Sequence, residues 1–326
     1  MKTQIVYTLI SSEKDYFLEE LWVSLYSLRL FHPESTVNVL VDEPTRKYME
    51  EFPELCDMIT NIVVVPVPEK YNAKQRSRVI KTSVRNVIDG AYLFIDTDTV
   101  ICKPLNDIDH LECDIAAVPD GHLLLKDCMF PPIQSTNSIF NTDVSDSKYW
   151  FNSGVMYVAD NKRTRKFYQK WNENWTYSCF EKDQSQDQPA LLFTDKEFGY
   201  VITELPGIYN AQVAMSLKYF ADAAIVHWWH MSFIENQDYS PYFSLQIYKD
   251  VKKFKGLSDE TIEQIEHCKQ SFASPSMPVG KEHIYFLFSP AGKIFNRIYK
   301  EGGVACFLMN KCASILEKIH KYTKKK

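Results

Sequence analysis

Apolar residues recur at two spacings along the chain, and these spacings predict strands and helices in alternation. Short apolar runs predict strands at residues 4–9, 37–41, 62–67, 92–95, 115–118, 154–158 and 223–227. Between them, apolar residues at helical spacing predict helices over 17–28 and 76–88. Strands separated by helices are typical of parallel β-α-β units, so we expect an α/β fold.

The alternation stops between residues 121 and 149, where Pro, Ser, Asn and Asp are frequent. A loop of this length inside a compact domain is more often functional than idle, so we expect ligand contacts there. Further along, Ser185 or Asp187 is placed to cap a helix that carries Pro189 in its first turn.

The composition is that of a globular protein with an uneven charge. Hydrophobic residues make up 45% and charged residues 24% of the 326 residues, which excludes a disordered or fibrous chain. A net charge of −5 argues against a nucleic-acid partner. Residues 281–326 carry ten Lys and Arg against three Asp and Glu, so this tail is basic and the remainder is acidic.

The basic tail also shows a helical repeat of apolar residues. Apolar residues at positions 304, 307, 308, 312, 315, 316 and 319 fall on one face of a helix. Lysines lie on the opposite face. Such helices lie in the headgroup region of anionic membranes, so we expect residues 293–326 to bind a membrane surface. Packing of these helices on the rest of the protein is the alternative.

The cysteines and the N-terminus bear on the compartment. None of the eight cysteines forms a C-x-x-C pair, and the N-terminal apolar stretch is too short for a signal peptide. No apolar run reaches the length of a membrane span. We therefore expect a cytoplasmic protein with reduced cysteines, attached at most peripherally to the inner face of the membrane.

Two carboxylates follow the strand at 92–95, in the sequence Asp96-Thr97-Asp98. Ligands of α/β sheets bind at the carboxyl ends of the strands, and a turn can aim both carboxylates at one point. Paired hard oxygens suit Mg²⁺ or Mn²⁺, whereas a single Asp in this place would only cap a turn. The pair therefore predicts a metal site.

Two further groups at strand ends are weak signals when taken alone. Asn152, Ser153 and Gly154 lie at the start of a strand, where glycine permits a close backbone approach and the polar side chains can bind a ligand. His227 ends the last strand, and a lone His there is more often structural than a ligand. It becomes a candidate ligand only if it faces the two aspartates.

The order of these motifs resembles that of glycosyltransferase family 8. After an N-terminal β-α-β unit come F-I-D-T-D-T-V (94–100), A-A-V-P-D (116–120), F-N-S-G-V-M-Y-V (151–158), D-Q (187–188), L-P-x-x-Y-N (205–210) and I-V-H (225–227). The resemblance covers about residues 3–230 and implies the GT-A fold, a Rossmann-like mixed sheet flanked by helices. We therefore expect a GT-A catalytic domain over residues 1–245 and a helical, basic C-terminal region over 246–326.

The resemblance also implies roles for single residues. It makes Asp96, Asp98 and His227 the ligands of Mn²⁺ or Mg²⁺. It places the donor and acceptor against Thr8, Arg78, Lys81, Asp96, Asp120, Asn152, Ser153 and Gly154, and the reacting centre at Asp187 and Gln188. The family usually has Gly and Lys after the strand-ending His. Here the chain continues H-W-W-H (227–230), so that charge would come from Arg76, Arg78, Lys81 or His230.

Together these features predict a metal-dependent glycosyltransferase. It would move a hexose from a nucleotide sugar, UDP-linked by resemblance, to a saccharide or lipid-linked glycan with retention of configuration. Two other classes stay open. D-x-D-x-T after an apolar strand is also the motif of haloacid-dehalogenase-like phosphatases, whose first Asp accepts a phosphoryl group. A nucleotide-sugar or glycan-binding protein without turnover would keep the same fold.

Overall fold

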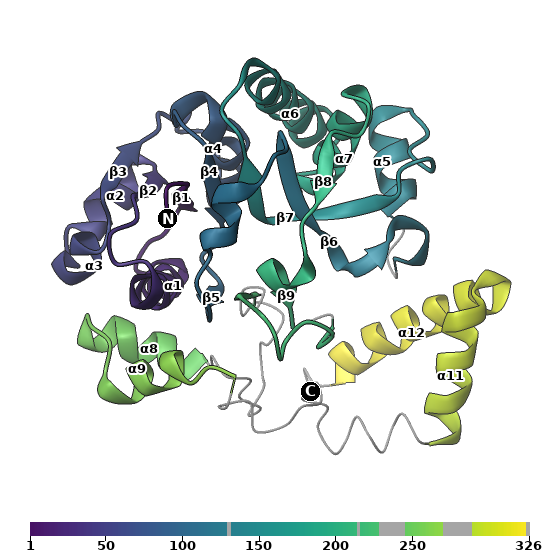
Figure 1. The fold of residues 1–326 in the computed structure, drawn as a ribbon. Coiled ribbons are helices and arrows are strands. Elements are labelled where there is room, and N and C mark those ends of the chain that lie inside the picture. Colours follow the sequence, from purple (N-terminus) through teal and green to yellow (C-terminus); the bar gives the residue numbers. More distant parts are fainter. Residues whose placement is uncertain (129–131, 214–215, 228–244, 270–288, 324–326) are drawn as a thin grey trace. The chain divides into compact units, whose positions relative to one another are not determined.

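The computed structural model describes residues 1–128, 132–213, 216–227, 245–269 and 289–323 (Figure 1). The chain divides into two compact units, Met1–Pro275 and Ser276–Lys326. The first unit contains both β-sheets and the candidate site.

Seven strands form the large sheet, in the spatial order β3-β2-β1-β4-β7-β6-β8. Their bounds are β1 Gln4–Leu9, β2 Val37–Val41, β3 Asn61–Val64, β4 Tyr92–Ile95, β6 Ile115–Leu124, β7 Tyr149–Val158 and β8 Ile202–Glu204. Pairing is parallel from β3 to β4, antiparallel on both sides of β7, and parallel between β6 and β8. The mixed sheet that the resemblance implied is therefore confirmed. The apolar pattern alone predicted the strand at 154–158 but not its antiparallel direction in β7, because hydrophobicity does not encode strand direction.

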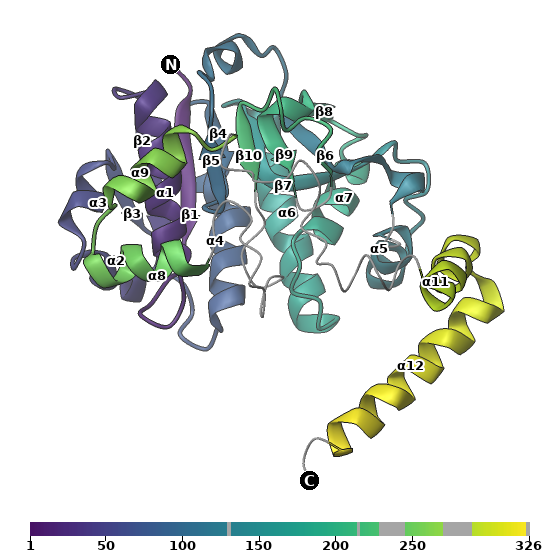
Figure 2. The same cartoon turned by 90° about the horizontal axis from the view of Figure 1, so that it is seen from below.

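Helices cover both faces of this sheet (Figures 1 and 2). One face packs against α4 (Ala73–Val87), α6 (Lys162–Glu181) and α7 (Gln188–Glu197). The core on the other face includes α1 (Phe17–Phe31), α2 (Glu43–Met49), α3 (Pro53–Asp57), α8 (Leu245–Phe254) and α9 (Asp259–Glu266). Helices on both faces make the centre of the sheet fully buried, as the continuous apolar strands predicted.

The central strand β4 divides its side chains between the two cores. Leu93 and Ile95 enter the core that contains α1, whereas Tyr92 and Phe94 enter the core that contains α4 and α6. Successive side chains of a strand point to opposite faces, so a strand buried on both faces reads as an unbroken apolar run. This burial fixes the point at which the chain leaves the sheet and Asp96 begins the polar turn.

A second sheet of three short strands lies beside the large one. It contains β5 (Thr99–Ile101), β10 (Ile225–His227) and β9 (Ala211–Gln212), with β10 in the middle. Strand β10 runs antiparallel to β5 and parallel to β9, which follows the 3₁₀ turn η3 (Gly207–Asn210). Residues 96–98 therefore connect the large sheet to the small one.

The segment 121–149 is not the single loop that the sequence predicted. Strand β6 runs on to Leu124, a 3₁₀ turn η2 (Leu125–Asp127) follows, and α5 (Pro132–Phe140) ends with Phe140 stacked on Phe193 of α7 at 4.3 Å. The backbone of Gly121 and His122 has positive φ, 60° at each residue, which interrupts the strand pairing. The register of the β6–β7 pair shifts on both sides of Pro119, and the residues after Val118 are less uniformly apolar, so the sequence pattern did not predict this part of the strand.

The second unit contains two helices, α11 (Pro290–Glu301) and α12 (Gly303–Thr323). The Ser289 side chain caps α11, and Gly302 ends it with a positive φ of 67°. Several apolar side chains of these helices are exposed, among them Tyr299, Val304, Phe307 and Leu316. None of the helices in the described ranges has both the length and the apolarity needed to cross a membrane.

The division between the units differs in position from the domain limit expected at residue 245. Ile247 and Val251 of α8 and Ile265 of α9 are buried in the core of the first unit. Lys252 of α8 also pairs with Glu19 of α1 at 3.4 Å. Helices α8 and α9 therefore belong to the first unit, which extends to Pro275.

Candidate functional site

Hydrogen bonds tie the turn that carries the two aspartates to β7 and to α1. The Asp96 N–H donates to the carbonyl oxygen of Gly154 at 2.7 Å, which ties the turn to β7. The Thr99 hydroxyl donates to the Asp96 carbonyl at 2.9 Å and lies 2.9 Å from the Ser24 hydroxyl of α1. These buried bonds fix the backbone, so both carboxylates extend from a rigid base.

Strand pairing brings His227 to this turn. His227 lies opposite Thr99 in the antiparallel β5–β10 pair, one residue from Asp98. Its Nε2 is 3.2 Å from Asp98 Oδ1, and one ligand atom each of Asp96, Asp98 and His227 lies within 4.8 Å of the others. Burial lowers the pKa of His227, but the charge and hydrogen bond of Asp98 outweigh it, and the pKa is raised overall. The imidazole thus lies in a position that favours a positive charge.

The cluster can form only because residue 154 has no side chain. A Cβ atom at this position would lie 2.4 Å from His227 Cε1 and 2.9 Å from both Asp96 Oδ2 and Asn152 Oδ1. Any other residue would therefore displace a candidate metal ligand. The sequence suggested a close backbone approach at Gly154, and in the structure the side chains of His227, Asp96 and Asn152 approach it.

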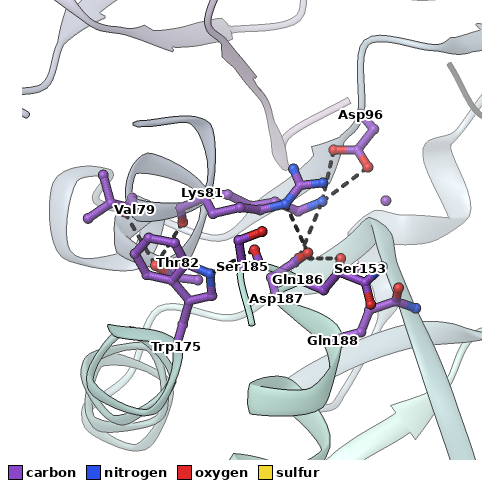
Figure 3. Close-up of polar contacts among 12 residues, drawn as sticks. Val79, Lys81, Thr82, Asp96, Ser153, Trp175, Ser185, Gln186, Asp187 and Gln188 are labelled. Atoms are coloured by element: carbon purple, nitrogen blue, oxygen red, sulfur yellow. Dashed lines mark hydrogen bonds and ion pairs between the residues drawn. The ribbon is translucent and has the colours of Figure 1, made fainter. Parts of the chain in front are cut away.

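Two cations of α4, Arg78 and Lys81, pair with carboxylates of the site, and Figure 3 shows Lys81 beside Asp96 and Asp187. The buried Lys81 ammonium contacts both oxygens of Asp96 at 2.9 and 3.0 Å and lies 3.8 Å from Asp187 Oδ2. Arg78 Nε is 3.0 Å from the other Asp187 oxygen. A capping box between Asn72 and Gln75 starts α4, and the two cations lie one turn apart, on one face of the helix.

The Asp187 carboxylate serves the site rather than the helix that follows it. It lies at the N-terminus of α7 but makes no capping hydrogen bond there. It instead accepts a hydrogen bond from the Ser153 hydroxyl at 2.7 Å and pairs with Arg78 and Lys81. Burial raises its pKa, but Arg78, Lys81 and Ser153 outweigh burial and bring the pKa to about 2. The capping role that the sequence suggested is therefore not the role of this side chain.

A third group of predicted residues forms a hydrogen-bonded chain. Asn152 Nδ2 donates to Asp120 Oδ1 at 2.8 Å, and Gln188 Nε2 donates to the same oxygen at 3.2 Å. Asn152 Oδ1 accepts from the Gly154 N–H and from Asn210 Nδ2, both at 2.9 Å. Burial raises the pKa of Asp120, while the bonds from Asn152 and Gln188 oppose the rise.

Some predicted or suggested residues lie elsewhere. Thr8 is half-buried on β1, in register with Leu40, and lies outside the networks above. Arg76 pairs with Asp42 at the end of β2, so Arg78 and Lys81 are the cations that the described part of α4 brings to the site. His230 lies outside the described residues.

Asn210 is a residue of the site for which the sequence suggested no role. It is the last residue of η3 and fully buried, and its Oδ1 lies 2.9 Å from His227 Nδ1. It belongs to the L-P-x-x-Y-N motif, but only the parallel pairing of β9 with β10 places it beside the histidine.

A cavity of about 220 Å³ opens next to this region, along the outer half of β6. Its lining includes His122, Tyr149, Glu204, Lys218 and Tyr219. The His122 ring meets the Tyr219 ring edge-on with centroids 4.7 Å apart. Burial and Lys218 lower the pKa of His122 to about 4, so this imidazole is neutral at pH 7. Aromatic rings and mixed polar groups of this kind can bind a sugar-sized polar ligand.

The charges of the site suit a divalent cation. Four carboxylates, of Asp96, Asp98, Asp120 and Asp187, face the two cations Arg78 and Lys81 in the described part of the chain. One divalent cation would balance the difference if His227 binds it as a neutral imidazole in place of a proton. Two carboxylates and one imidazole are ligands that Mn²⁺ and Mg²⁺ sites use, and the space kept by Gly154 leaves room beside them.

Comparisons with known proteins gave matches among solved structures only. No protein-family model and no curated protein matches the chain. Apo mouse xyloside xylosyltransferase 1 matches with a TM-score of 0.47 and 12% identity, over 70% of this chain and 97% of its own. The galactosyltransferase LgtC, solved with donor and acceptor sugar analogues, matches with a TM-score of 0.49 and 14% identity, over 80% and 100%.

The glycosyltransferase GlyE of Streptococcus pneumoniae TIGR4 matches with a TM-score of 0.48 and 18% identity. The match covers 84% of this chain and 66% of GlyE, so this chain spans about two thirds of that protein. All three are glycosyltransferases by name, the class of enzyme that the motif order predicts. At these identities and TM-scores the likeness by itself assigns neither a family nor an activity.

Proposed function

We propose that this protein is a metal-dependent glycosyltransferase that moves a hexose from a nucleotide sugar, with UDP as the expected nucleotide. One observation carries the proposal. Asp96, Asp98 and His227 converge at the carboxyl end of β4, directly beside the cations Arg78 and Lys81. A cluster of metal ligands next to two cations is suited to a diphosphate, whose charge the transfer increases.

The chain's own residues would hold the donor's diphosphate from two sides. Asp96, Asp98 and His227 would bind Mn²⁺ or Mg²⁺, which supplies Lewis-acid stabilisation of the leaving nucleoside diphosphate. Arg78 and Lys81, fixed by Asp187, supply positive charge that needs no reorganisation when the leaving group departs. In this proposal they take the place of the family's lysine after the strand-ending His, and the backbone near Thr8 contacts the base.

The sugar would lie between β7 and the start of α7. Asp187 stays ionised at neutral pH, so with the amide of Gln188 it can stabilise positive charge that develops on the sugar ring. Asp120 and Asn152, joined at 2.8 Å, and Ser153 offer hydrogen-bonding groups for the sugar hydroxyls. With no carboxylate assigned as nucleophile, we propose attack from the same face, with retention of configuration and proton transfer to a donor phosphate oxygen.

We assign the acceptor, a saccharide or a lipid-linked glycan, to the cavity lined by His122, Tyr149 and Tyr219. The cavity lies close to the proposed sugar site along the chain. Asp120, which is assigned to the sugar, directly precedes Gly121 and the cavity residue His122. The Gln212 N–H donates to His122 Nε2 at 3.3 Å, which orients this ring in the lining of the cavity.

For the second unit we propose attachment to an anionic membrane surface from the cytoplasmic side. Exposed apolar side chains on α11 and α12, such as Phe295, Phe307 and Leu316, accompany the exposed lysines Lys293 and Lys311. This composition suits a headgroup layer, where a lipid-linked acceptor would also lie.

The experiment that tests the enzyme class is a thermal-shift panel of nucleotide sugars with and without Mn²⁺, followed by a transfer assay. A ligand that binds only the folded protein raises its melting temperature. We expect a shift with a UDP-sugar that requires Mn²⁺, and transfer that Asp98→Asn reduces by 100-fold or more while the metal-free melting temperature changes little.

Other outcomes identify the other classes. Stabilisation by simple phosphomonoesters but by no nucleotide would favour a phosphatase that uses Asp96 as its nucleophile. Binding of a nucleotide sugar without transfer or donor hydrolysis would indicate a binding protein. Asp183→Asn, in the loop after α6, is a matched control, because Asp183 is exposed and lies outside the networks of the site.

A further inference from the structure

The candidate metal ligand His227 is held by a chain of amide hydrogen bonds whose direction can be assigned. The chain runs from the Gly154 backbone through Asn152 and Asn210 to the imidazole. The three side chains are almost completely buried: Asn152 is 7% exposed, Asn210 0% and His227 4%. Bulk water therefore cannot substitute for these bonds.

The direction starts at a group that can only donate. The Gly154 N–H lies 2.9 Å from one amide atom of Asn152, which must therefore be the oxygen, Oδ1. The other amide atom, Nδ2, then donates to Asp120 at 2.8 Å. The Asn210 amide atom that lies 2.9 Å from Asn152 Oδ1 must in turn be a donor, Nδ2. This leaves Asn210 Oδ1, which can only accept, against His227 Nδ1.

We infer that Asn210 is a positioning residue that holds His227 with its proton on Nδ1 and so presents Nε2 to the metal. An amide oxygen at 2.9 Å requires the proton on Nδ1. Nε2, on the side of the ring that faces Asp98 at 3.2 Å, is then the nitrogen that can bind a cation. The inference rests on the proposed function in that it takes the cluster to be a metal site.

The fold explains why this partner, at the end of η3, is an asparagine. The Asn210 side chain bridges an acceptor on β7, Asn152 Oδ1, and a donor on β10, the Nδ1–H of His227, so it has to carry both a donor and an acceptor. An aspartate could accept from the ring, but it would place a carboxylate oxygen against Asn152 Oδ1. A leucine has nearly the same size and can do neither. Partners of this kind typically change metal affinity 10- to 100-fold when they are removed.

The test compares Mn²⁺ binding by the full-length wild type and by Asn210→Leu, measured from the free-Mn²⁺ signal in electron paramagnetic resonance. We expect the variant to bind Mn²⁺ about 10- to 100-fold more weakly. Asn174→Leu is the matched control, because Asn174 is also a buried asparagine with side-chain partners but lies on α6, bonded to Thr194 and Glu197. It is expected to lose stability without losing Mn²⁺ affinity.

A second measurement observes the tautomer itself. Long-range ¹H–¹⁵N spectra of Mg²⁺-loaded protein with ¹⁵N-labelled histidine are expected to show His227 protonated on Nδ1 in the wild type and to lose this signature in Asn210→Leu. Equal Mn²⁺ affinity in a folded Asn210→Leu protein, or a wild-type ring protonated on Nε2 alone, would overturn the inference. If the wild type itself bound no Mn²⁺, the proposed metal site would fail instead.

Discussion

At the scale of single residues, Gly154 decides whether the metal cluster can form. Because a Cβ there would lie 2.4 Å from the His227 ring, Gly154→Ala is expected to displace the ring or the Asp96 carboxylate. We expect a cost of about 1–3 kcal/mol in the free energy of unfolding, as for other overpacked interiors, together with loss of Mn²⁺ binding. Urea unfolding and Mn²⁺ titration measure the two effects.

The control for this variant is Gly256→Ala, since a Cβ there would meet atoms no closer than 3.7 Å. It is expected to leave both quantities unchanged. Normal Mn²⁺ affinity in Gly154→Ala would show that the cluster has more room than the structure gives it.

The buried carboxyl group of Glu19 leads to a second prediction at this scale, for the free energy of unfolding as a function of pH. Glu19 is completely buried in α1, and its carboxylate lies 3.4 Å from the Lys252 ammonium. Burial raises its pKa from 4.5 to about 7, against the opposing effects of a backbone hydrogen bond and Lys252. The folded state therefore holds this proton more tightly than the unfolded state.

The stabilisation from this proton is fully present below about pH 4.5 and is lost as the pH rises through about 7. Relative to Glu19→Gln, the wild type is expected to lose up to ~3 kcal/mol in the free energy of unfolding between pH 4.5 and 8. Urea unfolding at four pH values measures the difference, with the exposed Glu54→Gln as control. A difference that stays constant with pH would contradict the raised pKa.

At the scale of elements, the cavity depends on how η3 and the segment after β9 meet β6. Tyr219 packs against Gly207 of η3, where a Cβ would lie 2.3 Å from its ring, and it meets His122 of β6 at 4.7 Å. Tyr219→Ala is expected to raise the KM for the saccharide acceptor about 10-fold, because a ring that packs on a sugar contributes about 1 kcal/mol or more.

Donor hydrolysis without acceptor should stay unchanged in this variant, because Tyr219 lies outside the metal cluster. Steady-state kinetics with varied acceptor and varied donor separate the two effects. An unchanged acceptor KM, or an equal loss in both reactions, would move the acceptor away from this cavity.

At the scale of the whole molecule, the two compact units allow the membrane role to be separated from the chemistry. The first unit ends at Pro275 and contains its own core, both sheets and the metal cluster. Full-length protein is expected to co-sediment with vesicles that contain phosphatidylserine and to be released by high salt, since each basic residue near such a surface contributes about 1 kcal/mol.

Protein truncated after Pro275 is expected to remain unbound in the same assay while keeping Mn²⁺ binding and donor hydrolysis. Vesicles of phosphatidylcholine alone are the control for the charge dependence. If truncated and full-length protein bind the anionic vesicles equally, or if neither binds, the second unit has no membrane role.

Part of this structure follows from the sequence by itself. The strands β1, β2 and β4, the helix α1 and the position of Asp96 and Asp98 at a strand end follow from apolar runs and their polar ends. These features are local, because burial on both faces of a strand leaves a continuous run of apolar residues. The motif order then predicted a mixed sheet flanked by helices, which the structure has.

Tertiary structure alone decided which residues meet. The antiparallel direction of β7, the contact of His227 with Asp98, and the place of Asn210 behind the ring depend on pairings between strands far apart in the chain. The same holds for Asp187, whose position at a helix start predicted a cap, although its carboxylate pairs with Arg78 and Lys81 of α4. Hydrophobic spacing records which side chains are buried but not which strand lies alongside, so these contacts could not be predicted from it.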